Sequence, residues 1–216
     1  MKATITSLIF LLLSLTVSSQ TYKYIGIEEG LSNQKIYKIQ KDARGYMWFL
    51  THVGIDQYNG KEIKHYKLRE GNRELDPLLN INWTFLDKTG TLLVTGKQGR
   101  IFRYDSGHDR FVQIYSMYNY WNKDYHAFVR YSYIDQEDNV WLCGKSAIHL
   151  FNIESGQKQR ISNRLGNITC IEQINSEHFF IGTDKRIYLA KLENGNLKEL
   201  SCGKLGMMDM HVQDRK

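Results

Sequence analysis

The residues best suited to contact a ligand lie in an aromatic segment near the middle of the chain, Tyr115 to His126. Aromatic rings can stack on the flat apolar faces of sugars while Asn and Asp side chains meet the hydroxyl groups. This predicts ligand contacts from Tyr118, Tyr120, Trp121, Tyr125 and His126. Packing of the rings against neighbouring elements is the simpler explanation, because buried aromatic area needs no ligand.

Motifs for catalysis, metal binding or cofactor binding are not found in the sequence. Gly144-Lys145-Ser146 resembles the end of a phosphate-binding loop, but Asn139 occupies the position of that loop's first Gly. The seven His residues include no His-Glu-x-x-His pair, and acidic turns such as Asp135 to Asn139 lack the order of a calcium loop. No Gly-x-Ser-x-Gly nucleophile elbow is present either. We therefore predict a chain that is not an enzyme and holds neither cofactor nor metal.

The composition is typical of a globular β protein. The 216 residues are 42% hydrophobic and 24% charged, with a single Pro beside 17 Gly and 14 Tyr, which favours aromatic strands separated by Gly turns. The formal charge of +6 is scattered along the chain. Cys143, Cys170 and Cys202 are odd in number, and the first two lie in apolar stretches, so we predict buried thiols and no disulfide framework.

The first 19 residues are typical of a signal peptide. Lys2 precedes an apolar run from Ile5 to Val17, which is shorter than the ~20 residues needed to cross a bilayer. Cleavage after Ser19 would leave Gln20 as the first residue of the mature chain, and no later stretch is long and apolar enough to span a membrane. We therefore predict a periplasmic location. Export removes nucleic acid as a partner and leaves an acidic glycan open.

Four similar segments organise the rest of the chain. Each joins an apolar strand through a polar turn to a second, aromatic or apolar strand, and the four run over 39–51, 85–95, 133–144 and 174–182. Alignment of Trp48, Leu93, Trp141 and Phe180 gives intervals of 45, 48 and 39 residues. These intervals bracket the length of a four-stranded propeller blade, roughly 40 to 50 residues.

The predicted fold is all-β, a partial β-propeller of about four four-stranded blades. After the signal peptide at 1–19, an N-terminal strand and lead-in segment (20–35) precedes the blades, which we place at 36–66, 81–115, 127–161 and 168–200. Residues 207–216 resemble the start of a fifth blade, so we expect a truncated chain whose partners include the remaining blades of its parent. An unfinished ring has open sheet edges, and we therefore expect poor solubility.

Three stretches, 29–33, 42–49 and 54–60, closely resemble the opening of the two-component regulator propeller repeat. In that family the repeat lies in the periplasmic part of hybrid sensor histidine kinases. The motif positions, which we interpret as structural, are Gly30, Leu31, Asp42, Gly45, Trp48, Gly54, Tyr58, Gly60, Asp87, Gly90 and Trp141. The sequence departs from the pattern at Leu50, where Gly is usual, and at Leu93 and Phe180, where Trp is usual.

The resemblance implies a sensing function for the parent protein. That parent would be anchored in the inner membrane, would detect a glycan-derived oligosaccharide outside it, and would bias a histidine kinase inside, with a homodimer as one arrangement. No kinase lies within these 216 residues. The alternatives are a secreted propeller scaffold that binds protein or surface glycan and, less favoured, an exported hydrolase or lyase.

Overall fold

The computed structural model describes residues 22–117, 128–193 and 195–204. Within these ranges the chain forms four antiparallel sheets of four strands each, and every sheet is built from consecutive strands. The first sheet contains β1 (Ile36–Lys41), β2 (Met47–Thr51), β3 (Ile55–Tyr58) and β4 (Ile63–Tyr66). The second contains β7 (Trp83–Leu86), β8 (Leu92–Thr95), β9 (Arg100–Asp105) and β10 (Arg110–Ser116).

The other two sheets have the same organisation. The third contains β11 (Tyr131–Ile134), β12 (Asn139–Cys143), β13 (Ala147–Asn152) and β14 (Lys158–Ser162). The fourth contains β15 (Ile168–Gln173), β16 (His178–Thr183), β17 (Arg186–Glu193) and β18 (Asn196–Lys204). The prediction of an all-β fold with four four-stranded blades is therefore confirmed. The predicted signal peptide and fifth blade lie outside the described residues.

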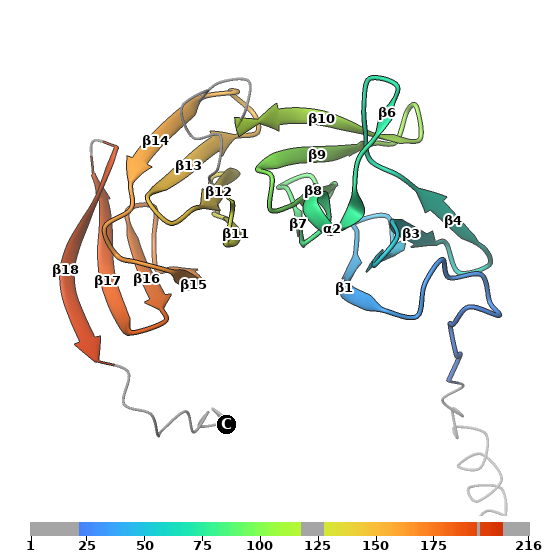
Figure 1. The fold of residues 1–216 in the computed structure, drawn as a ribbon, viewed down its shortest axis with the longest axis horizontal. Coiled ribbons are helices and arrows are strands. Elements are labelled where there is room, and N and C mark those ends of the chain that lie inside the picture. The colour runs from blue at the N-terminus through green and yellow to red at the C-terminus, as the bar shows by residue number, and fades with distance from the viewer. Residues whose placement is uncertain (1–21, 118–127, 194, 205–216) are drawn as a thin grey trace, which may run out of the picture.

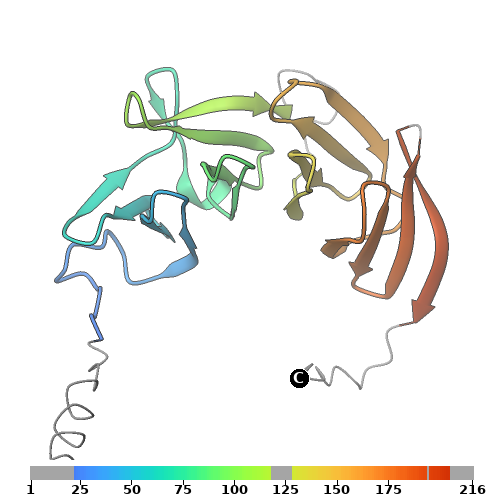
Figure 2. The same ribbon diagram turned by 180° about the vertical axis from the view of Figure 1, so that it is seen from behind.

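The four blades follow one another along an open arc (Figures 1 and 2). The first strand of each blade (β1, β7, β11 and β15) lies on the concave side, and the last strand (β4, β10, β14 and β18) lies on the convex side. Three hydrophobic clusters fill the spaces between consecutive blades. Because β8 and β12 are covered on both faces, apolar residues occupy consecutive positions in them, with no strict alternation of polar residues.

A turn between the first and second strands recurs in the first three blades. Asp42 Oδ1 accepts hydrogen bonds from the amides of Arg44 (3.0 Å) and Tyr46 (2.9 Å), and its Oδ2 accepts one from Trp48 Nε1 (2.8 Å). Asp135 is bonded in the same way, with Trp141 Nε1 2.9 Å away. This clasp joins the turn to the buried indole six residues later.

Blades 2 and 4 form the corresponding turn without an indole. In blade 2, Asp87 precedes Leu93, and its Oδ2 forms an ion pair with Arg103 on β9 (2.7 Å). In blade 4, Asn175 caps the turn instead, because its Oδ1 accepts from the amides of Glu177 (3.1 Å) and His178 (3.0 Å). The position of Trp is therefore replaceable as long as a side-chain oxygen holds the turn.

The turns also bond to one another across neighbouring blades. The amide that follows each turn Asp is the donor in all three cases: Ala43 to the carbonyl of Gly90 (3.2 Å), Lys88 to the carboxylate of Asp138 (3.1 Å), and Gln136 to the side-chain oxygen of Gln173 (2.6 Å). The same backbone position thus connects every pair of consecutive blades.

The connection between blades 1 and 2 contains structure that the repeat pattern did not predict. Two short strands, β5 (Arg69–Glu70) and β6 (Arg73–Glu74), form a hairpin, and α2 (Pro77–Asn80) follows it. Asp76 caps α2 by accepting a hydrogen bond from the amide of Leu78 (2.9 Å). The connection is anchored because Leu68, Leu75 and Ile81 are buried in the cluster between the two blades.

The predicted burial of two thiols holds for Cys143 and is wrong for Cys170. Cys143 is buried, whereas Cys170 and Cys202 are exposed, and none of the three forms a disulfide. A register shift between Ile168 and Cys170 turns Ile168 and Ile171 inward and leaves Cys170 on the solvent side. None of the helices in residues 22–117, 128–193 and 195–204 is long and apolar enough to cross a membrane.

Candidate functional site

The predicted ligand-contact residues Tyr118, Tyr120, Trp121, Tyr125 and His126 lie outside the described residues. The described ring that precedes them, Tyr115, is only 2% exposed and stacks on Phe151 with centroids 4.9 Å apart. This first ring of the aromatic segment therefore packs between blades 2 and 3. Phe128, on the other side of the segment, is 55% exposed.

The motif residues of the N-terminal segment dock onto blade 1. Leu31 is buried beside the turn at Gly30, and both the amide and the hydroxyl of Ser32 donate to Asp56 Oδ2 at 2.8 Å. His65 Nδ1 lies 2.8 Å from the other oxygen of the same carboxylate. Since the carboxylate lies between the hydroxyl and the imidazole, Ser32 has no general base, and the network is not a catalytic triad.

Several of the remaining motif residues lie in or beside turns. A Cβ on Gly54 would lie 2.9 Å from the carbonyl oxygen of Tyr66, and Gly90 has φ +74° with Ala43 directly opposite. Gly45 donates its amide to the carbonyl of Asp42 (3.0 Å). The hydroxyl of Tyr58 donates to the carbonyl of Gly60 (2.5 Å).

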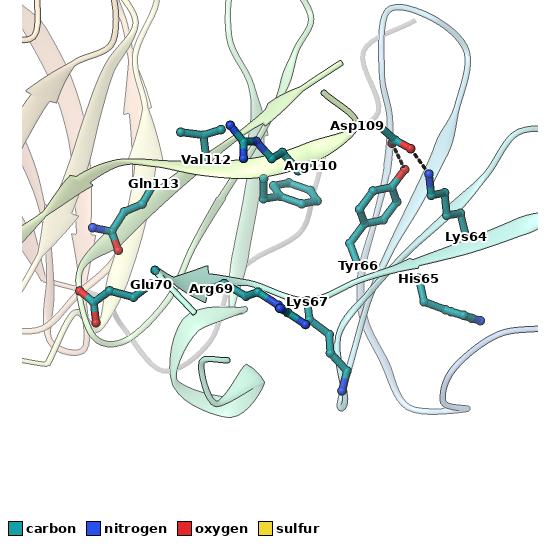
Figure 3. Close-up of a pocket in the computed structure, with 12 residues that line it drawn as sticks. Lys64, His65, Tyr66, Lys67, Arg69, Glu70, Asp109, Arg110, Val112 and Gln113 are labelled. Carbon is teal, nitrogen blue, oxygen red and sulfur yellow. Dashed lines mark hydrogen bonds and ion pairs between the residues drawn. The ribbon is translucent and has the colours of Figure 1, made fainter. Parts of the chain in front are cut away.

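A hollow of about 560 Å³ opens on the convex side of the arc between blades 1 and 2. It is lined by two segments, 64–71 from β4 and the β5–β6 hairpin, and 109–113 from the start of β10. We call it the outer groove. Its volume falls within the range of small-molecule sites, roughly 300 to 1,000 Å³. Figure 3 shows its two edges and the side chains between them.

Aromatic rings form the inner wall of the outer groove. Tyr66, Tyr104 and Phe111 surround the indole of Trp48, with ring centroids 5.5, 4.8 and 5.6 Å from it. Phe111 is the least buried of the four, and it lies between the two edges of the groove. The clasp of blade 1 therefore continues outward into a cluster of tilted and edge-to-face rings that reaches solvent.

Asp109 closes one end of the outer groove. Its Oδ1 accepts hydrogen bonds from the hydroxyls of Tyr66 (2.5 Å) and Tyr104 (2.7 Å), and its Oδ2 pairs with Lys64 (Figure 3). Burial, together with the hydrogen bond and charge of Tyr104, raises the pKa of Tyr66 well above its usual range. The Tyr66 phenol therefore remains a protonated donor at neutral pH.

The edges of the groove carry both paired and unpaired cationic side chains. Lys67 pairs with Glu74 (2.7 Å), and Glu70 pairs with Arg73 and Arg100 (3.3 Å each). Arg69 and Arg110 are exposed and form no ion pair in the part of the chain that the structure describes. The groove thus presents guanidinium and amide donors around an apolar ring.

This arrangement can bind a polar ligand, but it contains no recognisable catalytic centre. Its donors and acceptors are suited to hydroxyl and carboxylate groups, and Phe111 offers an apolar surface beside them. No group of three or more His, Cys, Asp and Glu side chains could hold a metal ion within residues 22–117, 128–193 and 195–204. The hydroxyl of Tyr66 is bonded to Asp109, but its raised pKa disfavours the phenolate form that a nucleophile requires.

Comparison with known families identifies the opening of the propeller. Residues 30–52 match the family described as two component regulator propeller. The match begins at Gly30 and ends after Thr51, so it covers the docking segment, the Asp42 clasp and the first two strands. It confirms the resemblance that the motifs predicted. No curated protein matches the chain.

Several solved structures share the fold. An extracellular domain assigned to a hybrid two component system of B. thetaiotaomicron is 16% identical, with a TM-score of 0.62 over 83% of this chain and 26% of the other. PorZ, a surface component of the type-IX secretion system of Porphyromonas gingivalis, is 8% identical (TM-score 0.52, 79% of this chain, 22% of PorZ). A protein of Bacteroides uniformis assigned as a 6-phosphogluconolactonase is 11% identical (TM-score 0.55, 80% and 55%).

These similarities concern the fold, because all three identities are low. The chain spans about a quarter of the length of the extracellular domain from B. thetaiotaomicron. An extracellular domain of a two component system, a secretion-system component and a protein assigned as a lactonase share this fold, so the fold does not select among their activities. The function has to be argued from this chain's own residues.

Proposed function

We propose that this chain is part of the extracellular sensor propeller of a hybrid two-component regulator and that it contributes to binding a glycan-derived oligosaccharide. The match of residues 30–52 to the regulator propeller family is the observation that carries the proposal. The similarity of the whole four-blade arc to an extracellular domain of such a system supports it. The predicted signal peptide supports an extracytoplasmic location.

The outer groove is the site that best suits an oligosaccharide. Sugar rings have an apolar face and a periphery of hydroxyl groups, which Phe111 and the side chains of Arg69 and Gln113 complement. These residues come from two blades, so a ligand in the groove contacts both. Such a ligand shifts a conformational equilibrium only if it binds one blade arrangement better than the other.

Isothermal titration calorimetry of the full chain with neutral and acidic hexasaccharides tests the binding. We expect a neutral hexasaccharide to bind, and the double variant Arg69→Gln/Gln113→Ala to weaken that binding at least tenfold. Lys38→Gln is the matched control, because Lys38 is exposed on β1 and does not line the groove. Binding unaffected by the groove variant would move the ligand elsewhere, and no binding by any hexasaccharide would contradict the proposal.

Two alternatives are separated by other measurements. A secreted scaffold without a kinase predicts a stop codon after Lys216 in the genome, whereas a sensor predicts a reading frame that continues into a membrane helix and a histidine kinase. An enzyme predicts turnover of an oligosaccharide by the purified chain. We expect none, because the raised pKa of Tyr66 makes its hydroxyl a poor nucleophile despite its hydrogen bond to Asp109.

A further inference from the structure

One end of the blades carries a distinct set of turns, which the topology brings together. Strands alternate in direction within each blade, so the turn between the second and third strands lies at the same end as the crossover to the next blade. Backbone hydrogen bonds join these segments: Gln98 to Leu79 (3.1 Å), Val129 to Lys97 (2.9 Å), Asn163 to Ser146 (2.9 Å) and Asp184 to Asn167 (3.2 Å). We call the surface formed by 96–99, 128–130, 144–146, 163–167 and 184–185 the crossover face.

The crossover face is basic. Its segments contain five exposed cationic side chains and one acidic side chain, Asp184, which accepts a hydrogen bond from Asn167 (3.2 Å). The cations are Lys97, Arg130, Lys145, Arg164 and Lys185. None of them forms an ion pair in the described part of the chain. Their charges are therefore available to an anionic partner.

The turns at the opposite end of the blades have the reverse charge. They contain nine acidic residues, Asp42, Glu62, Asp87, Asp109, Asp135, Glu137, Asp138, Glu154 and Glu177, and three basic residues, Arg44, Lys61 and Lys88. Several of these acids hold turns or pair with neighbours. The crossover face of blades 2 to 4 is thus basic and the opposite turns are acidic, whereas the crossover between blades 1 and 2 is balanced, with Lys67, Arg69 and Arg73 beside Glu70, Glu74 and Asp76.

An exposed ring lies among the cations at the junction of blades 2 and 3. Phe128 is 55% exposed, and the residues that follow it are fixed on both sides. The amide of Val129 donates to Lys97, and the amide of Arg130 donates to the carbonyl of Cys143 (2.8 Å), immediately before the turn that carries Lys145. The backbone that follows the ring is therefore fixed between the turns that carry Lys97 and Lys145.

We infer that the crossover face binds an acidic oligosaccharide, centred on Phe128 with Lys97, Arg130 and Lys145. The ring offers a surface for a sugar face, and the cations offer partners for carboxylate or sulfate groups. The cations are spread over three blades, which suits an extended chain with repeated charges better than a single small anion. The choice of a sugar over other polyanions rests on the proposed extracellular function.

Binding of a heparin hexasaccharide and an oligogalacturonate hexasaccharide to the full chain tests this inference, with maltohexaose as the neutral comparison. We expect at least one acidic probe to bind, and its affinity to fall at least tenfold in Lys97→Gln/Lys145→Gln and steeply with added salt. Lys61→Gln/Lys88→Gln removes the same charge from the opposite turns, and we expect less than a twofold change. Phe128→Ala is expected to weaken binding while leaving the salt dependence unchanged.

Other outcomes would overturn the inference. Equal losses in the two double variants would show that only the overall charge matters. Equally tight binding of a single-stranded oligonucleotide, unaffected by Phe128→Ala, would show a general polyanion surface without sugar recognition. Binding of maltohexaose alone, sensitive to Arg69→Gln/Gln113→Ala, would leave the proposed sensing function intact and refute this site. Circular dichroism of each variant verifies that the fold is retained.

Discussion

The junction of blades 1 and 2 and the junction of blades 3 and 4 are built around the same clasp but differ outside it. Trp48 and Trp141 each donate to an Asp six residues earlier and are fully buried. Around Trp48 the neighbours are Tyr66 and Tyr104. At the register positions that correspond to these tyrosines, the second junction has Ile161 and Ala190.

This difference distinguishes the residues that pack the core of both junctions from the residues that line a groove at only one of them. At the junction of blades 3 and 4, the indole packs on Phe179 (4.8 Å between centroids) among aliphatic side chains, and the neighbouring hollow is about 310 Å³. At the junction of blades 1 and 2, the phenols extend the core to Asp109 and to the larger outer groove. The clasp is therefore common to both junctions, and the polar groove is an addition to one.

The largest expected effect on stability comes from removing the buried indole that both junctions share. Trp48→Ala and Trp141→Ala are each expected to lower the free energy of unfolding by about 3–5 kcal/mol, because each deletes a fully buried ring and leaves a cavity. Urea denaturation followed by circular dichroism measures both. A loss below about 1 kcal/mol at either position would break the equivalence of the two junctions.

Transfer of a groove residue to the other junction should be less costly. Ala190→Tyr places the side chain of Tyr104 at the corresponding position of blade 4, where Ala190 is fully buried. We expect a loss of about 1–3 kcal/mol from overpacking, measured by the same denaturation. Ala190→Gly, which adds no volume, is the control for the position, and a neutral or stabilising Ala190→Tyr would contradict the description of this junction as closely packed.

Removal of the shared acceptor of the groove should cost about 1–2 kcal/mol. Asp109→Ala leaves the hydroxyls of Tyr66 and Tyr104 without their carboxylate, and buried donors without acceptors are unfavourable. Glu154, in the corresponding turn of blade 3, is exposed, so Glu154→Ala is the control, with an expected change below about 0.5 kcal/mol. Equal effects of the two variants would show that Asp109 does not organise the groove.

The smallest effect concerns stability at alkaline pH. Burial raises the pKa of Tyr66, Tyr131 and Tyr133, so the folded chain retains phenol protons that the unfolded chain releases near pH 10. The unfolded state then binds fewer protons, and stability is expected to fall as the pH rises above about 10. Thermal unfolding from pH 8 to pH 11 should show a shallower decline in Tyr66→Phe, and an unchanged slope would place the effect in blade 3.

The blades could be predicted from the sequence because their signals are local. A turn Asp, a buried ring six residues later and regular spacing recur within a single repeat, as at Asp42 and Trp48. The outer groove could not be predicted, because Tyr66, Asp109 and Phe111 come from different repeats and meet only through the packing of blades 1 and 2. Cys170 shows a further limit, since a local register shift reversed its side chain against the apolar pattern around it.

The bonds between consecutive turns have a consequence for how such a chain evolves. In all three, the donor is a main-chain amide at the position after the turn Asp, so Ala43, Lys88 and Gln136 make the same connection with unrelated side chains. Mutation of these residues leaves the donor in place unless it introduces Pro. The donor positions can therefore change in sequence without losing the bond, whereas two of the three acceptors are side chains, of Asp138 and Gln173, and tie the attachment to those residues.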